Sequence, residues 1–87
     1  MKMADAVNTY NYALNIIKEL GFSISILDHE ESFDWEAKKE SNTFIASDPL
    51  RLLGLILIGT EYGEEWNGMN IPNHYDLILK EHYNDNT

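Results

Sequence analysis

The segment that most restricts the fold is the apolar run Leu50–Ile58, in which Arg51 is the one charged residue. Ser47-Asp48-Pro49 precedes it. Asp is a favoured N-cap, and Pro fits the first helical turn because its missing N–H would be unpaired there. We therefore predict a helix from Pro49 to about Gly59. A buried strand over Gly54–Gly59 is the alternative, since periodicity does not distinguish the two in a short apolar run.

A helix over this run would be apolar on opposing sides. Leu53 and Leu57 fall on one side, and Leu52 and Ile56 fall on the other. Such a helix is either deeply buried or shared with another chain. We expect Leu53 to be buried. We also predict a homodimer through the Leu50–Ile58 helix, unless the last helix of the chain covers the second side.

Residues 4–20 have the spacing of an amphipathic helix. Apolar residues recur there at steps of three and four, as in Met3, Val7, Tyr10, Leu14 and Ile17. Asp5 is a candidate N-cap, and Gly21 lies where a left-handed C-cap belongs.

After Gly21 the apolar period changes to two, which is typical of half-buried strands. Polar turns separate three such segments, which contain Phe22, Ile24 and Ile26, then Phe33, Trp35 and Ala37, and lastly residues 43–46. Three successive strands with short turns predict an antiparallel meander. Trp35 falls on its inward side.

The C-terminal third is predicted to hold a loop and a short helix. Residues 61–69 contain two glycines and read as a loop, and Pro72-Asn73 precedes a helix over about 74–83. The 87 residues suffice for one domain. The predicted fold class is therefore α+β: residues 1–87 form a single small acidic domain with a helix, a three-stranded antiparallel meander, an apolar helix and a short C-terminal helix.

The charge balance restricts the partners. Fifteen Asp and Glu residues face six Lys and Arg residues, a formal net charge of −9. Such a field repels nucleic-acid phosphates and anionic membrane surfaces, and it attracts a partner with a basic surface. Double-stranded-RNA-binding domains share the order helix, three strands, helix. They need a basic cluster at the start of the last helix, where this chain has one cation, Arg51.

The absence of cysteine bears on compartment and chemistry. With no Cys in the chain, disulfides, thiol catalysis and Cys-based zinc sites are excluded. A small domain without disulfides is typical of a reducing compartment. The N-terminus lacks a signal-peptide core, and Leu50–Ile58 has about half of the ~20 residues that a membrane span needs. We therefore expect a soluble, cytoplasmic protein.

Two acidic segments are the candidate binding residues. The first combines five carboxylates in nine residues with no cation among them: Asp28, Glu30, Glu31, Asp34 and Glu36. The second is the predicted loop with Glu61, Glu64, Glu65 and the aromatic Trp66. Acidic surfaces dock basic partners, and aromatic residues commonly anchor interfaces. The alternatives are a solvated hairpin for the first segment and a core-closing lid for Trp66.

Catalytic and metal-binding patterns are missing from the sequence. The Asp28–Asp34 run lacks the glycine-centred loop of a calcium site, and His29-Glu30-Glu31 lacks the second His of a zinc protease. No serine has a nucleophile-elbow context, and no lysine follows Gly54 or Gly59 as a phosphate loop requires. We therefore expect no enzyme activity, no metal and no cofactor.

The function that these observations favour is a small acidic protein–protein interaction module. In size and charge it is similar to small inhibitors and immunity proteins that block a basic, nucleic-acid-handling enzyme. This likeness concerns bulk properties alone. A structural homodimeric domain and a small-ligand binder that uses the Trp66 loop are the alternatives.

Overall fold

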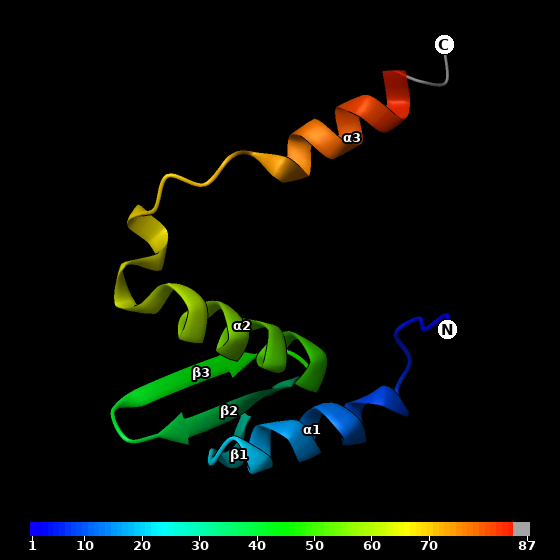
Figure 1. Cartoon of the computed structure of the whole chain (residues 1–87). Coiled ribbons are helices and arrows are strands. Elements are labelled where there is room, and N and C mark those ends of the chain that lie inside the picture. The colour runs from blue at the N-terminus through cyan, green and yellow to red at the C-terminus, as the bar shows by residue number, and fades with distance from the viewer. Residues whose placement is uncertain (85–87) are drawn as a thin grey trace.

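The computed structural model describes residues 1–84 (Figure 1). Its elements are α1 (Thr9–Glu19), β1 (Ser23–Asp28), β2 (Phe33–Lys39), β3 (Asn42–Ala46), α2 (Pro49–Tyr62), a 3₁₀ helix η1 (Gly63–Gly68) and α3 (His74–Asn84). This order confirms the predicted α+β fold, with a helix, a three-stranded antiparallel sheet and two further helices.

The first helix starts later than predicted. Its N-cap is Asn8, not Asp5, and residues 1–6 lie outside it. The chain forms a turn just before the helix instead. The Thr9 hydroxyl donates to the Ala6 carbonyl, and the Thr9 N–H donates to the same oxygen over 2.9 Å. Val7 stays 77% exposed. With no core to pack against at this end, the apolar spacing there does not extend the helix.

The sheet is an antiparallel meander in the order β1-β2-β3. Ile24 and Phe44 both pair with Ala37, and Ile26 and Ala46 both pair with Trp35. Residues that pair directly lie on the same face of a sheet. These six residues therefore share the inner face, as the period-two pattern predicts. The outer face carries Ser25, Leu27, Asp34, Glu36 and Ile45.

The segment after Asp48 is helical, so the strand alternative for Gly54–Gly59 is wrong. The Asp48 carboxylate accepts a hydrogen bond from the Arg51 N–H over 2.8 Å, and Pro49 occupies the first turn. The helix runs beyond the predicted end to Tyr62, where Gly63 with φ 74° stops it.

The core forms where α1 and α2 meet the inner face of the sheet. Its fully buried members are Ile17 of α1, Ala37 of β2, and Leu52 and Ile56 of α2. Leu53 packs against this cluster but is only partly buried. The expectation that Leu53 is buried is therefore wrong, and Leu52 is the buried leucine. The opposite side of α2 is open to solvent, with Leu57 57% exposed.

The C-terminal part leaves the core. Figure 1 shows α3 at the end of an extended segment, well separated from the sheet and from α1. It contributes no buried residue to the described part of the chain. Within residues 1–84, no helix has the length and apolar character needed to cross a membrane.

Candidate functional site

The tip of the β1–β2 hairpin presents the first group of predicted binding residues. The four residues 29–32 connect the strands, and the His29 N–H donates to the Ser32 carbonyl over 2.9 Å, which closes the turn. Asp28, Glu30 and Glu31 are exposed there. Within residues 1–84 none of these three carboxylates has a hydrogen bond or ion pair. We call these three residues the hairpin tip.

The other two carboxylates of this segment are engaged. His29 Nε2 lies 3.0 Å from an Asp34 carboxylate oxygen, which ties the turn to β2. The Glu36 side chain is only 12% exposed, and its carboxylate accepts from the Ser25 hydroxyl over 3.3 Å and lies 3.5 Å from Lys38 Nζ. Asp34 and Glu36 are thus on the predicted outer face, but each already has a partner within the chain, His29 for Asp34 and both Ser25 and Lys38 for Glu36.

An exposed aromatic residue lies next to the tip, although the sequence pattern predicts that it faces inward. Phe33 pairs with Asp28 across the hairpin and is 50% exposed, although it follows the inward pattern of β2. Its ring meets the Trp35 ring edge-on, with centroids 6.1 Å apart. Ile26, on the same face, is 43% exposed. The inner face therefore extends beyond the helices at this end, and no periodicity could reveal that.

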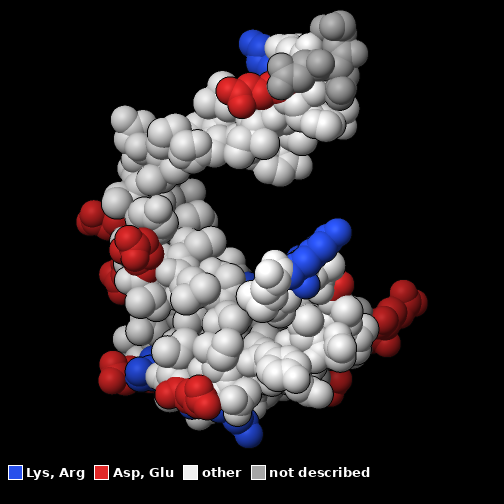
Figure 2. Space-filling view, turned by 45° about the vertical axis from the view of Figure 1, so that its right-hand side comes forward, with Lys and Arg blue, Asp and Glu red and all other residues white. Residues whose placement is uncertain are grey.

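The second group of predicted residues lies at the other end of the sheet. Glu61 lies in the last turn of α2, and Glu64, Glu65 and Trp66 belong to η1, next to the β2–β3 turn. The predicted loop over residues 61–69 is therefore wrong, since residues 61–68 are helical. The seven-residue β2 separates the two ends, which corresponds to about 20 Å. The two acidic groups therefore form two separate surfaces. Figure 2 likewise shows acidic side chains at several places rather than in one continuous patch.

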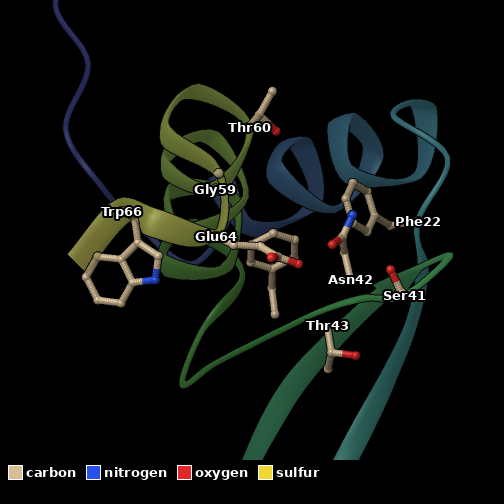
Figure 3. Close-up of a pocket in the computed structure, with 10 residues that line it drawn as sticks. Phe22, Ser41, Asn42, Thr43, Gly59, Thr60, Glu64 and Trp66 are labelled. Atoms are coloured by element: carbon tan, nitrogen blue, oxygen red, sulfur yellow. The ribbon is translucent and has the colours of Figure 1, made fainter. Parts of the chain in front are cut away.

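A hollow of about 430 Å³ lies beside η1 (Figure 3). Glu64 is directed towards its centre, and Trp66, 56% exposed, lies on the far side from Phe22. The β2–β3 turn and β3 place three polar residues on its wall that were not predicted as site residues, Ser41, Asn42 and Thr43. Their polarity is ordinary for a turn, so nothing in the sequence marked them.

Close packing of α2 on β3 shapes this hollow. A Cβ on Gly59 would lie 2.6 Å from a ring carbon of Phe44. The Phe44 ring in turn meets Phe22 edge-on, with centroids 5.8 Å apart. Because Gly59 has no side chain, the Phe44 ring, which lines the hollow, can pack directly against the backbone of α2.

Both surfaces offer groups that can bind a partner or a ligand. Among residues 1–84, no three His, Asp, Glu or Cys side chains gather as metal ligands would. The hairpin tip offers free carboxylates beside an aromatic ring, and the hollow offers hydroxyl, amide and carboxylate groups around two Phe rings. Comparison with protein-family models, curated proteins and solved structures finds no match.

Proposed function

We propose that this protein is an acidic interaction module that binds a partner protein with a basic surface through the hairpin tip. The observation that carries the proposal is the set of exposed, unpaired carboxylates of Asp28, Glu30 and Glu31 on a closed turn. Like charges so close together repel one another, and cations of a partner would relieve that repulsion. The overall charge of −9 would attract the same partner from a distance.

The neighbouring aromatic residue supports a protein as the partner. Interfaces combine a well-packed aromatic or aliphatic anchor with a polar rim. At this end of the sheet, half-exposed Phe33 and Ile26 supply an anchor, and the tip carboxylates supply the rim. We infer that the charges govern how fast the partner arrives and that Phe33 governs how long it stays.

The partner class that fits best is a basic, nucleic-acid-handling enzyme. Its phosphate-binding surface is cationic, and an acidic protein can occupy that surface in place of the nucleic acid. The module would then act as an inhibitor or immunity-type protein. A domain of this size without disulfides suits the cytoplasm.

Two triple variants with equal charge test the proposal. Asp28→Asn with Glu30→Gln and Glu31→Gln removes three charges at the tip. Glu61→Gln with Glu64→Gln and Glu65→Gln removes three charges at the other end of the sheet. Each variant and the wild-type chain are immobilised to capture partners from cell lysate at low salt, and association with the captured protein is then measured.

The tip variant should slow association about tenfold or more, and the second variant should change it little. Added salt should slow the wild-type association, because the Debye length falls to about 8 Å at physiological ionic strength. DNA should compete with the module for the partner. Equal effects of both variants would show that net charge alone matters, and an unchanged rate for the tip variant would refute the proposed site.

The hollow beside η1 supports a second candidate function, the binding of a small polar ligand. Its wall combines Ser41, Asn42, Thr43 and Glu64 with two aromatic rings. Trp66 lies on its rim and reports on it. A ligand screen should therefore find a saturable shift of tryptophan fluorescence in the wild-type chain that persists in Trp35→Phe and disappears in Trp66→Phe. A shift that depends on Trp35 instead would contradict binding at this hollow.

A further inference from the structure

The chain exposes far more surface than a protein of its mass needs to expose. Its accessible area is 7536 Å², whereas a compact monomer of 10.1 kDa exposes about 5,300 Å². Its radius of gyration is 16.1 Å, against about 12 Å for a compact chain of this length. The excess of roughly 2,200 Å² is more than the ~800 Å² that each partner buries in a stable interface of standard size.

Every residue of the C-terminal arm, which we define as residues 69–84, is exposed. Four exposed apolar side chains of its helix α3 share one face, Tyr75, Ile78, Leu79 and Tyr83, and Leu77 is exposed on the other side. An isolated helix shorter than ~12–15 residues is marginal in water, and α3 has 11. Its stability therefore requires a surface on which this apolar face can pack.

The same chain holds an apolar groove that none of residues 1–84 covers. The groove, of about 310 Å³, lies between β3 and the flank of α2 that carries Leu55 and Ile58, and it reaches Trp66. The residues that line it are Thr43, Phe44, Ile45, Leu55, Ile58, Gly59 and Trp66. None of them is charged, so the groove does not suit the basic partner proposed for the hairpin tip. It suits an apolar helix.

The backbone between η1 and α3 directs the arm away from the core of the same chain. Five residues without regular structure, Met69–Asn73, separate η1 from α3, and Met69 has extended angles of φ −74° and ψ 146°. The residue before a proline is restricted to extended backbone, so Pro72 extends Ile71 as well. Figure 2 shows open space between the arm and the rest of the molecule.

We propose that α3 docks in the groove of a second copy of this chain, in a symmetric dimer that exchanges its two arms. Two chains then fill two grooves, and the assembly closes without further growth.

The net charge of the arm is low, since α3 combines Asp76 and Glu81 with Lys80. Salt should strengthen this dimer by screening the repulsion between two acidic chains. It should weaken binding to a basic partner, so the two proposals are distinguishable.

The test compares two tyrosines of nearly equal exposure. Tyr75 in α3 is 77% exposed and Tyr12 in α1 is 74% exposed. Light scattering over a concentration series should show a dimer for the wild-type chain and for Tyr12→Asp. Tyr75→Asp should weaken dimerisation about 30-fold or more, as expected for loss of an aromatic anchor. It should also lose the helical circular dichroism of α3, because the free helix melts.

Crosslinking identifies which groove the arm occupies, since the chain has no native cysteine. Ile58→Cys places a thiol in the groove, and Ile78→Cys places one on α3. A mixture of the two single variants should form a disulfide between different chains. A wild-type chain that stays monomeric, a dimer that survives Tyr75→Asp, or an intramolecular disulfide in a monomeric double variant would each overturn arm exchange.

Discussion

Two glycines of α2 differ in what surrounds them, and this difference predicts opposite effects of the same substitution. A Cβ on Gly54 would meet no atom within 4 Å, whereas a Cβ on Gly59 would lie 2.6 and 2.8 Å from two carbons of the Phe44 ring. Alanine in place of glycine stabilises a helix interior by about 1 kcal/mol. Gly54→Ala should therefore raise the free energy of unfolding by about that amount.

Gly59→Ala gains the same propensity and loses more to the clash. The Phe44 ring cannot retreat freely, because it packs edge-on against Phe22 and against the core cluster. Overpacking of this kind costs about 1–3 kcal/mol. The net effect should therefore range from neutral to about 2 kcal/mol of destabilisation, and the two variants should differ by about 1–3 kcal/mol.

Urea unfolding measures this difference. Both substitutions are made in the Tyr75→Asp background, so that dimerisation does not contribute to the measured stability. With a slope of about 1–3 kcal/mol per molar urea, the two midpoints should be separated by roughly 1 M. Equal midpoints would show that the Phe44 ring does not lie against Gly59, and the packing of α2 on β3 described above would then be wrong.

Three further predictions concern the core and the helix ends. Leu52→Ala should cost about 2–5 kcal/mol, a large part of the ~5–10 kcal/mol expected for the domain, while Leu57→Ala on the open side of the same helix should change the melting temperature little. Asp48→Ala should cost about 1 kcal/mol by removing the N-cap of α2, and Asp48→Asn should restore most of it. Lys39 Nζ donates to the Leu20 carbonyl over 2.8 Å at the C-terminus of α1, so Lys39→Met should cost about 0.3–1 kcal/mol in thermal unfolding, less at high salt.

Local patterns predicted the parts of the fold that local physics determines. The alternation around Trp35 gave the face of β2, because side chains alternate along a strand wherever one face is buried. The Asp48-Pro49 pair gave the start of α2 because a cap is satisfied within a few residues. Both signals need only neighbours in sequence.

Features that depend on distant packing were not predicted. The sequence did not distinguish Leu52 from Leu53 as the buried leucine, since α2 is apolar on both sides and only the position of the sheet decides. It did not show that Glu36 is shielded, because Ser25 approaches it from another strand. It also did not show that the two acidic segments lie at opposite ends of the sheet, because that separation depends on the length and pairing of β2.

The strand order also determines how the chain should fold. Because the sheet follows chain order, each pairing closes a connection of only a few residues, residues 29–32 and 40–41. Local contacts of this kind form quickly, and hairpins form in about 1–10 µs. Association of two chains is a slower step whose rate depends on concentration. Refolding should therefore show a fast phase independent of protein concentration, followed by a phase that accelerates as concentration rises and that Tyr75→Asp removes.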